Sequence, residues 1–350
     1  MEKVQIKPDI RQLSQDKLIA QLTELGEKPF RARQIYEWLW AKSATNFDEM
    51  TNLSLNLREL LKNNYSIRNL SVSEAQFSSD KTIKSGFKLF DGNVVEGVLI
   101  PTEKRMTACI SSQVGCSLSC KFCATGSLDR KRNLEAGEIY DQVVLINQQA
   151  MENYGIPLSN IVLMGMGEPL LNYANVLKGI ERLTSPDGLN IAPKRITLST
   201  AGIAKMIKKL ADDQVRFNLA LSLHAADDEK RNSIMAINET NSLEELKEAL
   251  IYFYDQTSNK ITLEYIAFKN FNLGEEDAKN LVRFASTIPC KINIIEYNPI
   301  DNAKFKRAGV DELEKFTTFL EKKGLIVNVR RSRGKDIDAA CGQLANKSKN

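Results

Sequence analysis

The chain has 350 residues, of which 43% are hydrophobic and 26% are charged. This balance is typical of a soluble globular protein with room for one large domain and a small one. No apolar run approaches the roughly 20 residues that a membrane-spanning helix needs, so the sequence argues against a membrane protein. The formal net charge of +4 permits an anionic partner without requiring one.

Residues 1–75 are predicted to form a compact helical domain. Apolar residues recur at helical spacing over 13–25, 35–39 and 57–61, and Gly26 follows the first run as a C-cap. Basic residues on or near the second helix are Lys28, Arg31, Arg33 and Lys42. They could form a solvated helix face or an RNA-contacting face, and the sequence leaves both interpretations open.

Residues 76–104 are predicted to contain a β-hairpin that links this domain to the rest of the chain. Its turn is Asp91-Gly92, a strong hairpin signal. Strand periodicity places Glu96 on one face among aliphatic side chains. A poorly solvated carboxylate suits a general base. The alternative interpretation is a charge that protects an edge strand from pairing with another chain.

Four of the six cysteines lie between Cys109 and Cys123, and three of them, Cys116, Cys120 and Cys123, have the spacing C-x3-C-x2-C. An iron–sulfur cube is normally held by four thiolates. A loop that supplies three can therefore seat a cube and leave one iron open to a substrate or cofactor.

The alternative interpretations of this loop are a structural zinc site and a disulfide. Zinc wants a fourth ligand, and the only histidine, His224, lies far along the chain. A disulfide needs an oxidising compartment. The amino-terminal residues lack the apolar core of a signal peptide, so we expect a cytoplasmic protein.

Residues 105–345 alternate between predicted strands and helices. Strands are expected at 107–111, 160–164, 194–199, 215–224, 260–268, 291–298 and 324–330. Helices are expected near 134–150, 173–184, 202–212, 242–256, 274–287 and 311–323. Alternating units imply a parallel sheet, and six or seven of them fit a closed or partly open (β/α) barrel better than a doubly wound sheet. The polar tail, 346–350, is expected to fray.

Functional residues of parallel α/β proteins collect at the carboxyl ends of the strands. After the strand at 160–164 comes GMGEPLLN, where Gly165 and Gly167 would let the backbone approach a ligand and Glu168 offers a carboxylate. A tight turn is the alternative interpretation. Other polar or ligand-facing candidates at strand ends are Ser199, Ser222, Leu223, His224 and Asn298.

Near the carboxyl terminus, the stretch RRSRGKDIDAACGQLAN combines a basic cluster with Cys341. The basic residues could track phosphates. Small neighbours leave the sulfur of Cys341 accessible, and the residues alone leave open whether it is reactive or an inert small hydrophobe.

Together these motifs resemble those of the radical SAM rRNA adenine methyltransferases. The resemblance rests on CISSQVGCSLSCKFCATG, GMGEPLLN, ITLSTAG, LSLHA and DIDAACGQL, and it covers nearly the whole chain. It implies a partial (β/α)6 radical SAM barrel with a small helical, RNA-binding accessory domain at 1–75.

The resemblance also implies the cofactors. A [4Fe–4S] cluster would be held by Cys116, Cys120 and Cys123, and its open iron would bind S-adenosylmethionine (SAM), of which each turnover uses two. Positions that match SAM contacts in the family are Gly167, Glu168, Ser199, Ser222, Leu223, His224 and Asn298.

The mechanism that the resemblance implies proceeds through a methylated cysteine. Cys341 matches the carrier that takes a methyl group from the first SAM. The second SAM yields a 5′-deoxyadenosyl radical, which abstracts hydrogen from that methyl group so that it adds to adenine. Glu96 matches the proton acceptor. Cys109 matches the thiol that attacks Cys341, releases the RNA and leaves a transient disulfide.

The family has two branches, which methylate carbon 2 or carbon 8 of one adenosine in 23S rRNA. Pro169 resembles the carbon-2 branch, whose members also often modify the adenosine 3′ of the anticodon in tRNAs. We expect a monomeric carbon-2 enzyme that receives electrons from a flavodoxin or ferredoxin. The alternatives are a carbon-8 sibling, another radical SAM enzyme in which Cys109 and Cys341 are structural, and a zinc-stabilised RNA-binding module.

Overall fold

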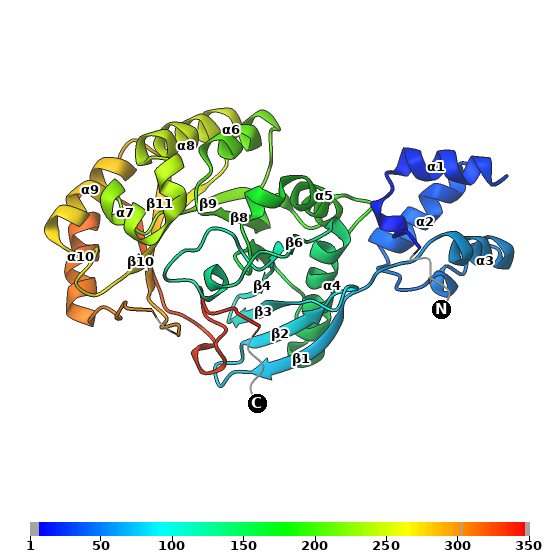
Figure 1. The fold of residues 1–350 in the computed structure, drawn as a ribbon, viewed down its shortest axis with the longest axis horizontal. Coiled ribbons are helices and arrows are strands. Elements are labelled where there is room, and N and C mark those ends of the chain that lie inside the picture. The colour runs from blue at the N-terminus through cyan, green and yellow to red at the C-terminus, as the bar shows by residue number, and fades with distance from the viewer. Residues whose placement is uncertain (1–6, 302, 347–350) are drawn as a thin grey trace.

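The computed structural model of the protein describes residues 7–301 and 303–346 (Figure 1). The helices are α1 (Gln15–Glu24), α2 (Phe30–Trp40), α3 (Leu55–Asn64), α4 (Ala136–Tyr154), α5 (Tyr173–Thr184), α6 (Ala204–Asp212), α7 (Asp228–Ile234), α8 (Leu243–Thr257), α9 (Glu275–Ala285) and α10 (Val310–Lys322). The strands are β1 (Ser71–Phe77), β2 (Ile83–Lys88), β3 (Val94–Thr102), β4 (Arg105–Cys109), β5 (Gln113–Val114), β6 (Arg132–Asn133), β7 (Asn160–Leu163), β8 (Ile196–Thr200), β9 (Asn218–Ser222), β10 (Ile261–Ala267), β11 (Cys290–Glu296) and β12 (Val327–Arg330).

The parallel part of the sheet is an open barrel. Strands β4 and β7 to β12 pair in chain order and run parallel, with helices in the connections between them. Within the described residues, β1 and β12 occupy the two ends of the sheet and do not pair with each other. The expected partial barrel is therefore confirmed, and each predicted strand and helix is present. The short helix α7 was not predicted.

Alternation along the strands produces two different faces. Leu219 and Leu221 of β9 are fully buried in the main hydrophobic core, as are Ile292 and Ile294 of β11. The residues between them on the opposite face are more polar, and Ser222 is only partly buried. This difference leaves a polar interior at the carboxyl ends of the strands, as the sequence indicated for β9.

The amino-terminal domain is helical only as far as Asn64. Ser14 and Ser54 cap α1 and α3 by accepting hydrogen bonds from backbone N–H groups in the first turns. The predicted boundary at residue 75 lies inside β1, so it is wrong by several residues. Because β1 is almost entirely exposed, its sequence SVSEAQF carries no apolar alternation that would reveal a strand.

The hairpin at 76–104 is part of the main sheet rather than a linker. Strands β2 and β3 pair antiparallel on either side of the Asp91-Gly92 turn, as predicted. However, β1 pairs with β2, and β3 pairs with β4, the first strand of the barrel. The hairpin therefore extends the barrel wall toward the carboxyl-terminal loop.

The helical domain is fixed to the barrel through α4 (Figure 1). Arg11 is buried and its guanidinium lies 2.7 Å from the carboxylate of Asp141 and 3.4 Å from that of Asp9. The hydroxyl of Tyr140 donates to the carbonyl of Trp40 at 2.6 Å, and their rings meet edge to face. This junction is a network of buried polar side chains.

The carboxyl-terminal loop crosses the open side of the barrel. The backbone N–H of Gly334 donates to Asp80, and Asp336 accepts from Ser78, so the loop is tied to the turn between β1 and β2. Asn346, predicted to begin a frayed tail, is instead hydrogen-bonded to the β3 strand through Val94 and Glu96. The rest of that predicted tail, 347–350, lies outside the described residues.

No helix among the described residues is long and apolar enough to cross a membrane.

Candidate active site

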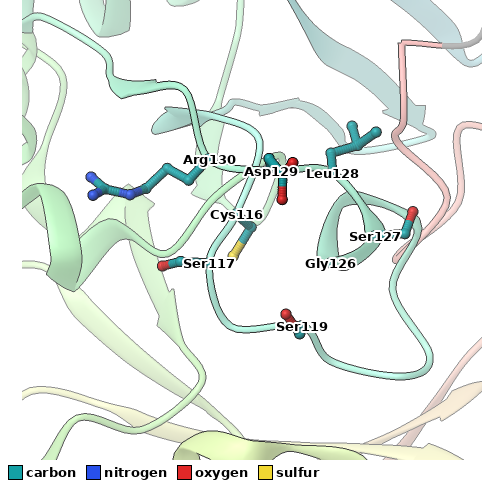
Figure 2. A pocket seen from close by; sticks show the side chains of 8 residues that line it. All are labelled: Cys116, Ser117, Ser119, Gly126, Ser127, Leu128, Asp129 and Arg130. Atoms are coloured by element: carbon teal, nitrogen blue, oxygen red, sulfur yellow. The ribbon is translucent and has the colours of Figure 1, made fainter.

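The three-cysteine loop is closed at its base by a short two-stranded sheet. Strands β5 and β6 pair antiparallel, and the backbone N–H of Cys116 donates to the carbonyl of Leu128 at 3.1 Å. The loop surrounds a cavity of about 560 Å³, which Cys116, Ser119 and Arg130 help to line. Figure 2 shows the loop curving around the hollow, with the sulfur of Cys116 directed toward its inside.

The thiols of Cys116, Cys120 and Cys123 are close enough to influence one another. Burial raises the pKa of the Cys116 thiol to about 11, and it also raises the pKa of Cys120 and of Cys123. Cys120 is additionally affected by both other thiols and by Glu168. A positively charged group bound among them would stabilise the thiolate forms.

These residues fit an iron–sulfur cube by their chemistry. Among the described residues, no three His, Cys, Asp or Glu side chains converge as the ligands of one metal ion do. In a cube each thiolate binds its own iron, so convergence on one point is not required. A buried oxygen without a partner lies nearby as well: Oδ1 of Asn298 accepts no hydrogen bond from the protein. It offers an acceptor to a bound polar ligand.

An aromatic side chain anchors the loop to the barrel. Phe122 is buried, and its ring meets the imidazole of His224 edge to face with centroids 4.7 Å apart. On its other side it contacts Phe268, in a hydrophobic cluster separate from the main core. The position of the last loop cysteine, Cys123, is therefore set by packing against the strand ends.

The GMGEPLLN turn is shaped by glycine and closed by its carboxylate. Gly167 has φ of +93°, and a Cβ atom there would lie 2.4 Å from Cβ of Gln113, so no larger residue fits. Glu168 is buried and accepts hydrogen bonds from the N–H groups of Leu170 at 3.0 Å and Ala201 at 2.8 Å. Burial raises the pKa of the Glu168 carboxyl. The carboxylate ties this turn to the end of β8.

The remaining strand-end candidates lie on neighbouring strands. The hydroxyl oxygens of Ser199 and Ser222 are 3.5 Å apart, and Leu223 is fully buried. Nδ1 of His224 accepts a hydrogen bond from the N–H of Ile266 at 3.1 Å, which places the imidazole proton on Nε2. Burial, with Arg231 nearby, lowers the pKa of His224 to about 3, so the ring is neutral.

The Cys341 loop packs directly on the cysteine loop. The carbonyl of Gly342 accepts from the N–H of Ala124 at 2.7 Å, and the carbonyl of Leu344 accepts from the hydroxyl of Thr125 at 2.6 Å. Gly342 has φ of +83°, and a Cβ atom there would lie 3.2 Å from the carbonyl oxygen of Phe122. Small residues therefore allow the two loops to meet backbone to backbone.

The thiols of Cys109 and Cys341 are near enough to interact electrostatically, although they are 232 positions apart in the sequence. Burial raises the pKa of the Cys109 thiol to about 12, and the thiol of Cys341 adds to this rise. Cys341 keeps an exposed surface, while the protein around it also raises the pKa of its thiol. Every cysteine in the structure is a free thiol. The structure thus brings the two outlying cysteines together beside the three-cysteine loop.

Glu96 is not on an edge strand, so the interpretation as an edge-protecting charge is wrong. Strand β3 lies between β2 and β4, and Glu96 is buried. Its surroundings are also less apolar than predicted, because the ammonium of Lys84 lies 3.3 Å from Oε1. Oε2 accepts from the N–H groups of Ala345 at 2.8 Å and Asn346 at 3.1 Å. The carboxylate is therefore joined to the Cys341 loop.

Two features of the site were missed in the sequence. Arg231, on the unpredicted α7, is fully buried and donates to the carbonyls of Ala201 and Leu223 at two strand ends. Glu264 on β10 is buried and accepts from the side chain of Asn293 on β11. The signal for Glu264 was available as a carboxylate inside an apolar strand, whereas Arg231 sits in the polar run DEKRNSI.

Comparisons with known proteins agree with this architecture. A family model described as the ribosomal RNA large subunit methyltransferase N-terminal domain matches residues 8–67, and the radical SAM superfamily model matches residues 110–285. A crystal structure of a radical SAM methyltransferase from Sphaerobacter thermophilus superposes with a TM-score of 0.90 at 37% identity, covering 96% of this chain and 99% of that one.

Relatives of known name are similar along almost the entire chain. A probable dual-specificity RNA methyltransferase RlmN from Cytophaga hutchinsonii is 65% identical over 339 residues, which cover 97% of this chain and 93% of that protein. The dual-specificity RNA methyltransferase RlmN from Geotalea uraniireducens is 43% identical over 344 residues, covering 98% and 97%. The chain therefore belongs to the RlmN family of radical SAM RNA methyltransferases.

Proposed function

We propose that the protein methylates carbon 2 of an adenosine in the peptidyl transferase centre of 23S rRNA, and of the adenosine 3′ of the anticodon in tRNAs. The observation that carries this proposal is the meeting of Cys341, Cys109 and the three-cysteine loop in one place. Carbon 2 of adenine is electron-poor and cannot attack the methyl group of SAM. A methyl group carried on a cysteine of the protein can instead be turned into a radical that adds to this carbon.

The family implies a [4Fe–4S] cluster and SAM, and Cys116, Cys120 and Cys123 would hold the cluster. When bound, the cluster supplies the one electron that cleaves SAM to methionine and a 5′-deoxyadenosyl radical. Gly167 and Glu168 would contact one end of SAM. The other expected contacts are Ser199, Ser222, Leu223, His224 and Asn298. The neutral imidazole of His224 and the unpaired Oδ1 of Asn298 suit neutral polar groups of that ligand.

Three residues of the chain would handle the methyl group and the protons. Cys341, with its exposed surface, would accept the methyl of a first SAM by displacement. Glu96 would take the proton from the adenine ring. Cys109 would then attack the sulfur of Cys341. The carbon–sulfur bond that links Cys341 to the RNA breaks, the released carbon takes up a proton to become the methyl group, and the two sulfurs form a disulfide that cellular dithiols reduce.

The amino-terminal domain supplies a surface suited to RNA. Phe30 is exposed, and the guanidinium of Arg31 lies over its ring at 4.9 Å. The ammonium of Lys42 lies 4.1 Å from the ring centroid of Trp38. Trp38 is partly buried and Phe30 is exposed. Cationic groups beside accessible aromatic rings can contact phosphates and stack on unpaired bases. This supports the RNA-contacting interpretation of the second helix.

We further propose that the enzyme works as a cytoplasmic monomer. A reducing compartment keeps Cys109 and Cys341 as thiols between turnovers. A flavodoxin or ferredoxin would supply the electron for the cluster. The target base would be extruded from its RNA stack to reach the barrel interior.

The decisive experiment separates the carbon positions and tests the carrier. Anaerobically purified protein with SAM and a reductant would be incubated with 23S rRNA or tRNA, and the nucleosides would be identified by mass spectrometry. 2-Methyladenosine is expected, together with methyl-labelled Cys341 before RNA is added. 8-Methyladenosine would identify the sibling activity. Turnover with Cys341→Ala would assign the chain to other radical SAM chemistry.

A further inference from the structure

Lys84 has no role in the chemistry proposed above, yet it is the one buried lysine among the described residues. It lies on β2 with 4% of its surface exposed, and no apolar pattern predicted it to be inside. A buried ammonium is costly unless it is paired. Its partner is Glu96, at 3.3 Å.

The sheet register places this pair beside the reactive thiols. Lys84 lies opposite Val98 in the β2–β3 pairing, and Val98 lies opposite Cys109 in the β3–β4 pairing. Opposite residues project from the same face of a sheet. Glu96, two residues from Val98, projects from that face as well. Lys84, Glu96 and Cys109 therefore share one side of the barrel wall.

The two oxygens of Glu96 have different partners. Oε1 faces Lys84, while Oε2 accepts from the backbone N–H groups of Ala345 and Asn346. Asn346 also donates its side-chain N–H to the carbonyl of Val94 at 2.7 Å. These bonds hold the far end of the loop whose near end, at Gly342, rests on the cysteine loop.

We propose that Lys84 is a positioning residue that fixes the carboxylate of Glu96 and thereby seats the loop carrying Cys341. Paired with Lys84, the carboxylate is held in one orientation, so that Oε2 offers a strong acceptor to two adjacent N–H groups. Without Lys84 the buried carboxylate has lost its cationic partner and would turn toward water. The importance of seating Cys341 rests on the proposed function.

The surroundings of the pair leave room for that change. A small cavity of about 170 Å³ lies beside it, lined by Ser73, Gln76 and Asn346 among others. Water can therefore reach the carboxylate from the β1 side when the ion pair is lost. The released segment would expose its backbone N–H groups to the same water.

The test measures backbone exchange in the segment itself. Hydrogen–deuterium exchange would be followed by mass spectrometry in the peptide spanning 341–346 of the anaerobically purified holoenzyme. Lys84→Met is expected to exchange about fivefold faster than wild type in this peptide, the factor that corresponds to losing one net hydrogen bond. Lys84→Arg, which keeps the charge, should restore slow exchange. Unchanged exchange in a folded Lys84→Met protein would overturn the proposal.

A double-mutant cycle tests the route through the carboxylate. Glu96→Ala should also speed exchange, and adding Lys84→Met to it should change nothing further, because Lys84 acts through Glu96. Additive effects would overturn that route. If Lys84→Met fails to fold, Lys84→Gln removes the charge and keeps a polar end, and the same faster exchange is expected. Lys178→Met, at a half-buried lysine of α5, is the matched control and should leave this peptide unchanged.

The same samples separate this inference from the proposed function. Lys84→Met should lower kcat for RNA methylation while KM for RNA stays near the wild-type value, since the RNA-binding surface is untouched. If wild type methylates RNA and the exchange of Lys84→Met is normal, the inference fails alone. If wild type does not methylate RNA but the exchange changes as expected, the proposed function fails and the positioning role stands.

Discussion

The amino-terminal domain and the carboxyl-terminal segment both rest on the barrel, but they are attached by different means. The amino-terminal domain is joined through Arg11, whose buried guanidinium pairs with Asp141 of α4. Separating the two would leave a buried carboxylate without its cation. The carboxyl-terminal segment is joined mainly through backbone N–H and C=O groups, with the Leu344 side chain buried in the main core. When it leaves, water can satisfy those groups, and Glu96 keeps Lys84 as its partner.

The two attachments differ in the free energy that is needed to break them. Breaking a buried ion pair by losing one partner costs about 3–5 kcal/mol, whereas a backbone hydrogen bond exchanged for water costs about 1 kcal/mol. The helical domain is therefore a fixed part of the enzyme. The hydrogen bonds of the Cys341 segment cost less to break, which suits the proposed role of Cys341 as a carrier.

Removal of the cysteine sulfurs gives the largest expected effect. Cys341→Ala should abolish RNA methylation, because Cys341 is the proposed carrier of the methyl group. Cys109→Ala should instead accumulate a covalent protein–RNA adduct, visible as a shifted band in a denaturing gel. Cys290→Ala, at the cysteine of β11 outside the site, is the control and should retain turnover. Free turnover by Cys109→Ala would exclude the resolving role.

Loss of the amino-terminal ion pair should give the largest change in stability. Arg11→Met is expected to lower the free energy of unfolding by about 3–5 kcal/mol, since Asp9 and Asp141 then remain buried without their cation. Chemical denaturation measures this. Lys279→Met, which breaks an exposed pair with Glu275, should leave the midpoint unchanged. A small effect of Arg11→Met would mean that this domain is as loosely attached as the carboxyl-terminal segment.

The stability of the barrel should depend on pH through His224. His224 is the only histidine, and its pKa is lowered to about 3 in the folded protein, so it stays neutral while the unfolded chain takes up a proton below about pH 6.5. Its contribution is fully present above pH 6.5 and is lost as the pH falls toward 3. Between pH 7 and 5 the wild type should lose about 2 kcal/mol more than His224→Gln. Equal losses would show that His224 is not responsible.

The smallest expected effect concerns a single hydrogen bond of the carboxyl-terminal segment. Thr125→Val removes the donor to the carbonyl of Leu344 and should lower the free energy of unfolding by about 1 kcal/mol or less. Exchange in the 341–346 peptide should rise nevertheless. Ser127→Ala, which removes a bond within the same short turn, should not affect that peptide. A larger loss of global stability would place this segment among the fixed parts.

The sequence predicted the barrel because its signals are local. Each parallel strand is a short apolar run of its own, and Asp91-Gly92 selects a tight turn regardless of what surrounds it. The missed elements carry weaker signals. Exposed β1 has no alternation, and α7 is seven residues long without an apolar stripe. Both depend on contacts with distant parts of the chain: β1 pairs with β2, and Arg231 of α7 donates to carbonyls at two strand ends.

The residues of the candidate site also divide into those with a local sequence signal and those without one. Cys116, Cys120, Cys123 and the strand-end residues were found because spacing and strand ends are visible in the chain. The nearness of Cys109 to Cys341 was implied only by a family resemblance. Pairing of Lys84 with Glu96 depends on the register of β2 against β3, and the role of Arg231 depends on carbonyls from two other strands. Such long-range relations are not encoded in any one segment.

The open sheet has a consequence for the protein in concentrated solution. Unpaired outer strands are sites where another molecule can add a strand and begin to aggregate. Strand β1 meets this hazard with a register shift between Val72 and Glu74, which bends its outer edge. Strand β12 carries the exposed Asn328 and Arg330. The barrel can thus stay open while these features of its two outer strands disfavour pairing with another molecule.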